Sequence, residues 1–275
     1  MQLDFGKNVL NLDTPKAMGI LNYNPDSFYD GGQFQDIKSA LHHIAEMLEA
    51  GASIIDIGGM SSKPGSEIIN SDEEQKRIIP LLKEALSIFP DTIFSIDTIH
   101  SATAKIALDS GAHIINDISG ALFDRKMIET VSSFNATIVL MHMKGTPMTM
   151  QSQTHYDDLM GDILAYFQQR IGSCKEQSLL KLIIDPGFGF AKNAQQNFQL
   201  LKNMSVFKSF NLPVLVGLSR KSMIYKTLNC EAKDALNGTT ALNMIALQNG
   251  ANILRVHDMK QAIETIKLYN ALSVG

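Results

Sequence analysis

The chain has 275 residues, of which 45% are hydrophobic and 19% are charged, with 24 basic and 28 acidic side chains. This apolar content excludes an intrinsically disordered chain, and no apolar run approaches the ~20 residues that a membrane span needs. A formal net charge of -4 argues against a nucleic-acid-binding protein, which usually carries a basic stripe. The amino terminus lacks the pattern of a secretory signal, and Cys174 and Cys230 match no disulfide framework or metal-ligand spacing. We therefore expect a globular protein of the cytoplasm.

Short apolar runs rich in β-branched residues alternate with amphipathic stretches along the chain. Continuous apolar runs are typical of parallel strands that are buried on both faces. The predicted strands are 17–21, 53–58, 92–97, 113–117, 137–142, 181–185, 213–218 and 251–256. Eight such strand and helix units predict a (β/α)₈ TIM barrel that occupies 1–275 as a single domain. An open, doubly wound parallel sheet is the main alternative.

The segments between the predicted strands add detail to this architecture. Residues 2–12 could form a β-hairpin that closes the floor of the barrel, and 36–51 has the apolar spacing of an amphipathic helix. Ser71 is an N-cap candidate for the next helix, because acidic residues follow it directly. The long interval 142–185 predicts an extended helix.

Each predicted strand ends in side chains that hydrogen-bond or carry charge. These are Asn22, Asp56, Asp97, Asn116 with Asp117, His142, Asp185, Arg220 with Lys221, and Arg255 with His257. An aspartate at a strand end often only caps the next helix, but a polar end on all eight strands indicates a polar ring around one mouth. Seven basic residues also follow strands, which favours an anionic ligand such as phosphate or diphosphate: Lys63, Lys144, Lys192, Arg220, Lys221, Arg255 and His257.

Two loops are long and rich in turn residues, namely 22–32 and 58–66, and loops of this kind can close over a ligand and exclude water. The segment 185–192 is no dinucleotide fingerprint, because Lys192 stands where the third glycine is needed. The segment 218–222 lacks the upstream glycine of a P-loop. No cluster of His and Cys has metal-ligand spacing, so any metal would be a hard ion such as Mg²⁺ held by oxygen.

Eight motifs that span the chain together resemble the dihydropteroate synthase family of pterin-binding enzymes. They are MGILNYNPDSFYDGG (18–32), DIGGMSSKPGS (56–66), SIDT (95–98), NDISG (116–120), MHMKG (141–145), DPGFGFAK (185–192), GLSRKS (217–222) and RVHD (255–258). The resemblance implies a transferase of folate biosynthesis that joins (7,8-dihydropterin-6-yl)methyl diphosphate to 4-aminobenzoate and releases diphosphate with Mg²⁺ present. It also implies a homodimeric TIM barrel that sulfonamides inhibit.

The resemblance carries over site residues motif by motif. Asn22 matches the metal contact, and the expected catalytic residues are Asp97, Lys221, Arg255 and His257. The pterin pocket matches Asp97, Asn116, Met141, Asp185 and Lys221. The diphosphate site matches Ser62, Lys63, Arg255, Val256 and His257, with Val256 contributing mainly through its backbone. The aminobenzoate pocket matches Phe28, Pro64, Phe190 and Ser222.

The second loop departs from the family pattern Glu-Ser-Thr-Arg-Pro-Gly. Lys63 keeps the charge of the arginine but loses its bidentate fork, and Met60 loses the carboxylate of the glutamate. Two alternative functions are a methyltransferase that passes a methyl group from a folate to a corrinoid, and a non-catalytic pterin-binding paralogue. The first would not need the Arg255 and His257 site, and the second would bind pterin diphosphate without turning it over.

Overall fold

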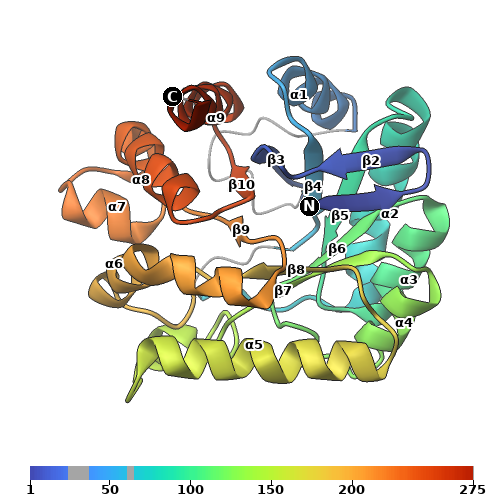
Figure 1. Ribbon diagram of the computed structural model, residues 1–275. Helices are drawn as coiled ribbons and strands as arrows, with labels where there is room; N and C mark the ends of the chain where they lie inside the picture. The colour runs from blue at the N-terminus through green and yellow to red at the C-terminus, as the bar shows by residue number, and fades with distance from the viewer. Residues whose placement is uncertain (24–36, 61–64, 275) are drawn as a thin grey trace.

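The computed structural model describes residues 1–23, 37–60 and 65–274, with side chains through residue 272. An eight-stranded parallel sheet forms a nearly closed barrel, and helices surround it (Figure 1). The strands in chain order are β3 (Lys16–Asn22), β4 (Ile54–Gly58), β5 (Ile93–Asp97), β6 (Ile114–Asp117), β7 (Thr137–Met141), β8 (Leu182–Asp185), β9 (Leu215–Val216) and β10 (Ile253–Val256). Their spatial order is β8-β7-β6-β5-β4-β3-β10-β9. The predicted TIM barrel is confirmed, and the open sheet is excluded.

One seam of the barrel is held more loosely than the others. Between β8 and β9 the pairing is an isolated parallel bridge, Ile184 to Val214, with one hydrogen bond from Ile184 N to Pro213 O at 3.0 Å. The sequence predicts a longer strand over 213–218, but β9 has two residues. Pro213 has no N–H to donate to a neighbouring strand, which limits pairing on this side.

Helices follow the strands and cover the outside of the barrel. They are α1 (Ile37–Glu49), α2 (Ser71–Ile88), α3 (Ser101–Ser110), α4 (Met127–Ser133), α5 (Leu159–Glu176), α6 (Ala194–Asn203), α7 (Ser222–Thr227), α8 (Leu236–Gln248) and α9 (Met259–Val274), with the 3₁₀ turns η2 (Met150–Ser152), η3 (Met204–Phe210) and η4 (Ala232–Asp234). The long helix expected within 142–185 is α5. Across the described ranges, no helix combines the length and apolar character of a membrane span.

The start of α2 differs from the prediction by one residue. Asn70 is the N-cap, because its side-chain oxygen accepts a hydrogen bond from Glu73 N at 2.9 Å, and Ser71 is already the first helical residue. The acidic first turn predicted for this helix is present, with Asp72, Glu73 and Glu74. Both neighbouring residue types are good caps, so the sequence pattern alone could not separate them.

The interior of the barrel is apolar at the amino-terminal ends of the strands. Side chains alternate along a strand, so that every second residue points into the barrel. Each strand contributes one buried residue to a floor cluster: Met18, Ile54, Ile93, Ile114, Val139, Ile183, Leu215 and Ile253. The alternate residues, such as Ile55 and Ile115, belong instead to the larger cluster that packs beneath the helices.

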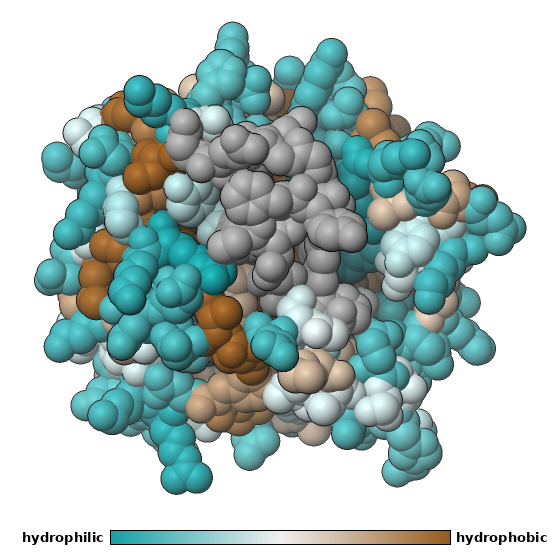
Figure 2. Space-filling model, turned by 180° about the vertical axis from the view of Figure 1, so that it is seen from behind, coloured by the Kyte–Doolittle hydropathy of each residue, from teal (hydrophilic) through white to brown (hydrophobic). Residues whose placement is uncertain are grey.

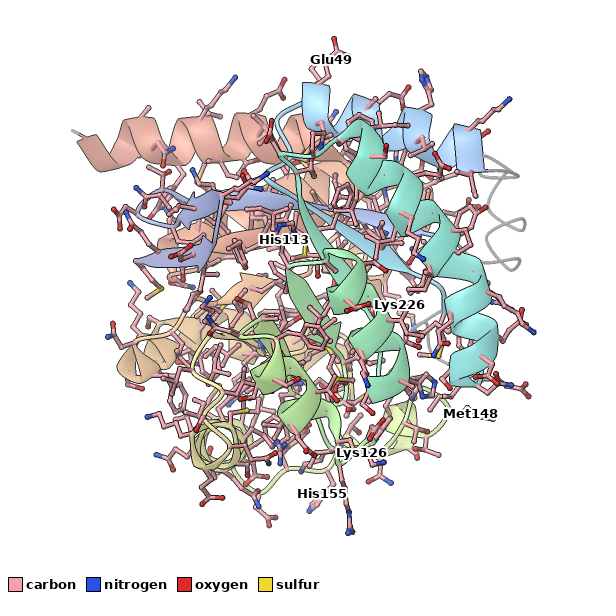
Figure 3. All side chains as sticks on the ribbon, turned by 90° about the vertical axis from the view of Figure 1, so that its right-hand side faces the viewer. Glu49, His113, Lys126, Met148, His155 and Lys226 are labelled. Atoms are coloured by element: carbon pink, nitrogen blue, oxygen red, sulfur yellow. The ribbon has the colours of Figure 1, made fainter. Side chains whose placement is uncertain are left out.

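A hairpin closes this floor, as the sequence predicts. β1 (Gln2–Phe5) pairs antiparallel with β2 (Asn8–Asn11), and Leu3, Leu10 and Leu12 join the floor cluster from outside the barrel. Figure 3 shows the barrel from the side, with the hairpin at one end and Met148, in the segment after β7, at the other. The polar strand ends therefore gather at the end opposite the hairpin.

Candidate active site

On five of the strands, the next residue that points into the barrel beyond the floor is polar. Two residues after the floor residue, β4, β5, β6, β8 and β10 present Asp56, Ser95, Asn116, Asp185 and Arg255. Each of the first four is at most 8% exposed, although each is polar or charged. Buried polar groups are costly unless they are paired, so their mutual contacts decide what this mouth can do. Figure 2 shows the outer surface at the mouth end of the barrel, where the described residues are largely hydrophilic, with isolated apolar patches.

Arg255 ties two carboxylates together across the barrel. Its Nε donates to Asp56 Oδ2 at 2.7 Å, and its Nη2 donates to Asp97 Oδ2 at 2.8 Å. Asn116 Nδ2 also donates to Asp56 Oδ2, at 2.9 Å. Asp56 Oδ1 has no hydrogen-bond partner within the described part of the chain. The mouth therefore contains an ion-pair network built from four different strands.

Asp56 is the member of this network for which the sequence predicts no specific role. In the sequence it is only a polar residue near the end of a predicted strand. The signal that could have found it is the alternation along β4, which places Asp56 on the same face as the floor residue Ile54. Its partner Arg255 is 199 residues away in the sequence, so the contact itself has no local signal.

Asp97 has an unusual protonation equilibrium. Burial raises the pKa of its carboxyl from 3.8 to about 7, the cation of Arg255 opposes the shift, and the nearby carboxylate of Asp56 adds to it. For Arg255, burial favours proton loss, but Asp56 and Asp97 outweigh it and raise its pKa. The guanidinium therefore stays charged between two carboxylates, one of which titrates near neutral pH.

A second charged pair lies across the seam between β8 and β9. Burial raises the pKa of Asp185 and lowers that of Lys221 to about 8, while the attraction between the two groups opposes both shifts. Asp185 Oδ1 accepts a hydrogen bond from Gly187 N at 2.8 Å. Lys221 Nζ donates to Phe188 O and lies 4.6 Å from the centre of the Phe190 ring.

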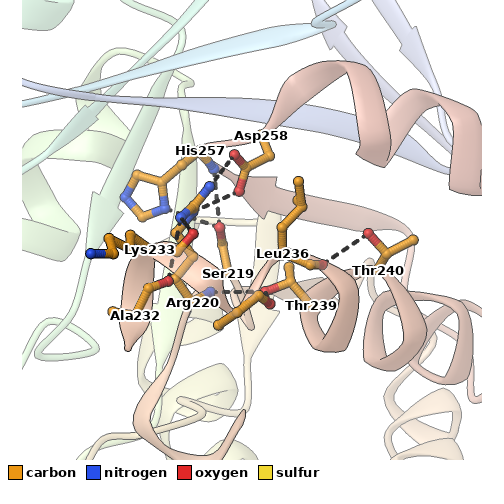
Figure 4. Close-up of polar contacts among 10 residues, drawn as sticks. Ser219, Arg220, Ala232, Lys233, Leu236, Thr239, Thr240, His257 and Asp258 are labelled. Carbon is orange, nitrogen blue, oxygen red and sulfur yellow. Dashed lines mark hydrogen bonds and ion pairs between the residues drawn. The ribbon is translucent and has the colours of Figure 1, made fainter. Parts of the chain in front are cut away.

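His257 follows β10 at the rim, where it is exposed. Its Nδ1 is 3.0 Å from Ser219 Oγ, and its backbone N donates to the same oxygen at 3.3 Å (Figure 4). Beside it, Arg220 donates two hydrogen bonds to Asp258, from Nε at 2.9 Å and from Nη2 at 2.7 Å. Arg220 is therefore occupied by the protein itself.

The cations predicted for an anionic ligand thus divide into two groups. Lys144 donates to His155 O at 3.0 Å and lies over the Tyr156 ring, and Lys192 is buried against backbone carbonyls, so these side chains, like Arg220, serve the fold. The basic pattern in the sequence therefore overstated the cations available to a ligand. Lys221, Arg255 and His257 remain at the mouth, and Lys63 lies outside the described residues.

Gly58 makes room for two of the site residues. A Cβ atom at this position would lie 3.3 Å from Asp97 Cβ and 3.7 Å from Asn22 Oδ1. A larger residue would therefore press on Asp97. Asn22, the last residue of β3, thus lies beside the carboxylate network. Within the described ranges, no three His, Cys, Asp or Glu side chains form a metal-binding group.

Met60 lies in an apolar cluster at the mouth rather than among the charges. It is 6% exposed, and it packs with Ile99, Ile118, Met141, Met143, Met150 and Ala191. Phe190 is half-buried against the same cluster. A methionine suits this irregular apolar site because its side chain is flexible and polarizable. The missing carboxylate at position 60 is therefore replaced by packing.

The remaining predicted residues are placed as follows. Met141 is buried at the end of β7, and its carbonyl accepts a hydrogen bond from Tyr166 Oη at 2.7 Å. The side chain of Val256 belongs to the cluster that packs beneath the helices and does not line the mouth. Ser222 is exposed at the first position of α7. Phe28, Ser62, Lys63 and Pro64 lie outside the described residues.

Comparison with known proteins supports the family resemblance that the sequence motifs indicate. The family model of pterin binding enzymes matches residues 18–257. The dihydropteroate synthase of Escherichia coli strain K12 is 41% identical over 264 residues, which covers 95% of this chain and 93% of that protein. The Synechocystis dihydropteroate synthase is 42% identical over 259 residues, covering 93% and 89%.

Solved structures agree with these sequence comparisons. A Yersinia pestis dihydropteroate synthase in complex with a sulfonamide drug superposes with a TM-score of 0.96 at 40% identity, covering 100% of both chains. A Xanthomonas albilineans dihydropteroate synthase with 4-aminobenzoic acid has a TM-score of 0.92 at 33% identity, covering 100% of this chain and 98% of that one.

Proposed function

The chain belongs to the pterin-binding enzyme family and catalyses the dihydropteroate synthase reaction of folate biosynthesis, and from this premise we propose how its residues act. The observation that carries the proposal is the Arg255 bridge between Asp56 and Asp97 at the carboxyl ends of the strands. It places one cation and one titratable carboxylate in the same buried mouth. The substrates are a pterin methyl diphosphate and 4-aminobenzoate. Residues 1–275 act as one catalytic domain.

The pterin lies in the polar half of the mouth. Asp185 is suited to accept the paired N–H groups of the aminopyrimidine edge, because a buried carboxylate offers two acceptor oxygens. Asn116 can donate and accept at once, and Lys221 donates to the ring carbonyl and nitrogen. Met141, which is buried beside these groups, supplies an apolar wall against the flat ring.

The diphosphate lies toward the rim, where Arg255 and His257 follow one another on β10. Arg255 uses Nε and Nη2 for the two carboxylates, and its Nη1 donates to no acceptor in the described part of the chain. Nη1 is therefore the guanidinium nitrogen that is suited to the anionic leaving group. The Val256 backbone, Ser62 and Lys63 complete this part of the site.

The aminobenzoate lies on the other side of the mouth. Phe190 supplies an aromatic surface, and its ring is already oriented by the ammonium group of Lys221. Ser222 at the start of α7 is suited to hydrogen-bond the carboxylate of this substrate. Phe28 and Pro64 frame the remaining edge. A sulfonamide would compete for the same surface.

The donor chemistry at Asn22 fits Mg²⁺. Its side-chain oxygen lies beside the Asp97 carboxylate at an edge of the mouth, and Mg²⁺ is typically held by few protein oxygens together with substrate phosphates and water. Asn22 would hold the ion, which, when bound, neutralises charge on the diphosphate.

The reaction is a dissociative, SN1-like substitution. Arg255 and His257 stabilise the negative charge of the departing diphosphate, while the Asp97 carboxylate stabilises the positive charge that spreads over the pterin. The amine nitrogen of 4-aminobenzoate then attacks the exocyclic carbon and loses a proton. No protein nucleophile is required.

The test is diphosphate release by the purified protein with pterin diphosphate and Mg²⁺, with and without 4-aminobenzoate. Release that depends on the amine, with dihydropteroate in equal amount, is the expected result. Release without the amine would show that ionisation occurs but water captures the cation. Tight pterin binding without release would favour the binding paralogue or the methyltransferase and would contradict the proposal.

The chain functions as a homodimer in the cytoplasm. The exposed apolar residues Ile245 on α8 and Leu268 and Leu272 on α9 support a contact surface on these two late helices. Light scattering on the purified protein tests the assembly. A monomer at micromolar concentration would contradict it.

A further inference from the structure

Lys192 is a buried side chain to which the mechanism assigns no task. It is 3% exposed, although lysine is rarely buried without a charged partner. Its Nζ lies within hydrogen-bond distance of three groups: His142 Nδ1 at 2.9 Å, Gly187 O at 3.0 Å and Phe190 O at 3.0 Å. Nζ donates to the two backbone carbonyls, and the His142 ring nitrogen supplies the third contact.

Lys192 forms no ion pair within the described residues, and burial, together with the nearby cations Lys221 and Lys144, lowers its pKa well below 10.5, although Asp185 opposes this shift. Placing an amine here is therefore unfavourable in itself. An apolar side chain would fill the same space at less expense. What the amine contributes, and an apolar residue could not, is the set of three hydrogen bonds.

Two of those bonds hold one loop, the segment 186–191 that follows Asp185. Other side chains hold the same segment: Asn197 Oδ1 accepts from Gly189 N at 2.7 Å, and Tyr156 Oη donates to Ala191 O at 3.0 Å. Gly187, Gly189 and Ala191 all have positive φ, so the segment follows no regular secondary structure that could hold it by itself.

The loop carries two groups that the proposed reaction uses. One is the Phe190 ring, beside which Lys221 Nζ lies at 4.6 Å, and the other is Phe188 O, to which Lys221 donates. The third bond of Lys192 reaches His142, which directly follows Met141 in the pterin pocket. Lys192 thus connects the end of β7 to the loop after β8.

We propose that Lys192 is a positioning residue that fixes the loop 186–191 and, through the Phe190 carbonyl, sets the surface against which 4-aminobenzoate binds. This inference rests on the proposed function. The Nζ of Lys192 touches no substrate in this arrangement. Lys221 keeps the electrostatic attraction of Asp185 when the loop shifts. Phe190, in contrast, has lost the bond to its own carbonyl. The amine substrate is therefore affected more than the pterin.

The experiment compares Lys192→Met with the wild type and with Lys202→Met, an exposed lysine on α6 that provides a matched control. For Lys192→Met we expect the KM for 4-aminobenzoate to rise about tenfold, because small displacements of a positioning group are costly. The dissociation constant for pterin diphosphate should change less than about threefold, as should kcat. Lys202→Met should match the wild type.

A folded Lys192→Met protein with an unchanged KM for 4-aminobenzoate would overturn the inference, as would equal losses for both substrates. If Lys192→Met fails to fold, Tyr156→Phe decides the question, because it removes a single hydrogen bond to the same loop. It should raise the same KM about two- to threefold, and no rise would contradict the inference. A wild type that releases no diphosphate would instead contradict the proposed function.

Discussion

The floor and the mouth of this barrel are built on the same strands but have opposite chemistry. At the floor, eight strands contribute eight apolar residues, which three leucines of the N-terminal segment cover. Two to four residues further along, three of these strands present a buried network in which Arg255 bridges Asp56 and Asp97. The backbone pairing is continuous between the two layers.

This contrast separates stability from function along a single strand. The floor gains stability from burial of apolar surface, and this gain requires no special geometry beyond close packing. The mouth has to offset the desolvation of charged groups through paired contacts, and those contacts also hold the groups that we propose act on the substrates. Substitutions in the two layers should therefore differ in kind, and the following predictions test that difference.

The largest effect should come from removing the shared cation. Arg255→Met leaves the carboxyls of Asp56 and Asp97 buried without a positive charge, and we expect the free energy of unfolding to fall by about 3–5 kcal/mol at pH 8. The loss should shrink toward pH 5, because protonation of Asp97 there relieves its repulsion with Asp56. Urea unfolding at both pH values measures it.

The matched control is Lys233→Met, since Lys233 pairs with Glu231 at the surface, where the two side chains are 73% and 74% exposed. This substitution should change the unfolding free energy by no more than about 0.5 kcal/mol. Equal losses of unfolding free energy in the two variants would show that the buried network contributes no more to stability than a surface ion pair.

Asp97→Asn should mainly affect turnover. The amide keeps the shape but removes the negative charge opposite the pterin, and we expect kcat to fall about 100- to 1000-fold. The dissociation constant of pterin diphosphate should change much less. Steady-state kinetics with calorimetric binding measures both, and Asp109→Asn on the exposed side of α3 is the control. Equal losses in binding and turnover would contradict the electrostatic role of Asp97.

The mouth should also determine the pH dependence of activity. Asp97 must be ionised and Lys221 must be protonated, and burial places their pKa values at about 7 and about 8. The profile of kcat/KM should therefore be a narrow bell, with losses of roughly tenfold per pH unit outside this interval. In Asp97→Asn, the acidic limb should disappear. A flat profile between pH 6 and 9 would contradict the assignment.

The same pKa shifts have a consequence for stability. Because the folded state raises the pKa of Asp97 from 3.8 to about 7, it binds more protons than the unfolded state in that interval, and stability falls as the pH rises through it. Lys221 has the opposite sign, since its pKa falls from 10.5 to about 8, so stability rises from pH 8 to pH 10.5. Denaturant midpoints across this range check both slopes.

The smallest effect should appear at the floor. Ile114→Val removes one methylene group from a fully buried side chain, and we expect a loss of about 0.5–1.5 kcal/mol in unfolding free energy. The kcat should match the wild type at a temperature where both proteins are folded. A tenfold loss of activity would show that the floor and the mouth are coupled more closely than the packing indicates.

The sequence predicted the barrel well because its strands are short β-branched runs with polar ends. The predicted ends at Asp97, Asp117 and Asp185 coincide with the ends of β5, β6 and β8. The prediction was wrong in length at β9, where the apolar run 213–218 contains Pro213. Hydropathy does not register that a proline lacks an N–H, so the run alone indicated a full strand.

The candidate site was predictable in its residue types but not in its contacts. Strand ends indicated which side chains lie at the mouth, whereas the partner of each depends on neighbours that are distant in sequence. The sequence pattern predicts both Lys192 and Arg220 as cations for a ligand, yet Lys192 donates to the loop 186–191 and Arg220 pairs with Asp258. Composition and spacing show how many cations follow the strands, but they do not show which partners the nitrogen atoms of those cations contact.

The loose seam of the barrel divides the proposed pterin pocket. Asp185 ends β8 on one side, while Lys221 follows β9 on the other, and a single bridge between Ile184 and Val214 joins the two strands. Local opening of the barrel wall should begin at this bridge. The amide proton of Ile184 should therefore exchange with solvent sooner than the amide protons of β4 or β5. A ligand that contacts Asp185 and Lys221 together would close the seam and slow this exchange. The wall of the barrel would thus be fully closed between β8 and β9 only while the substrate is bound.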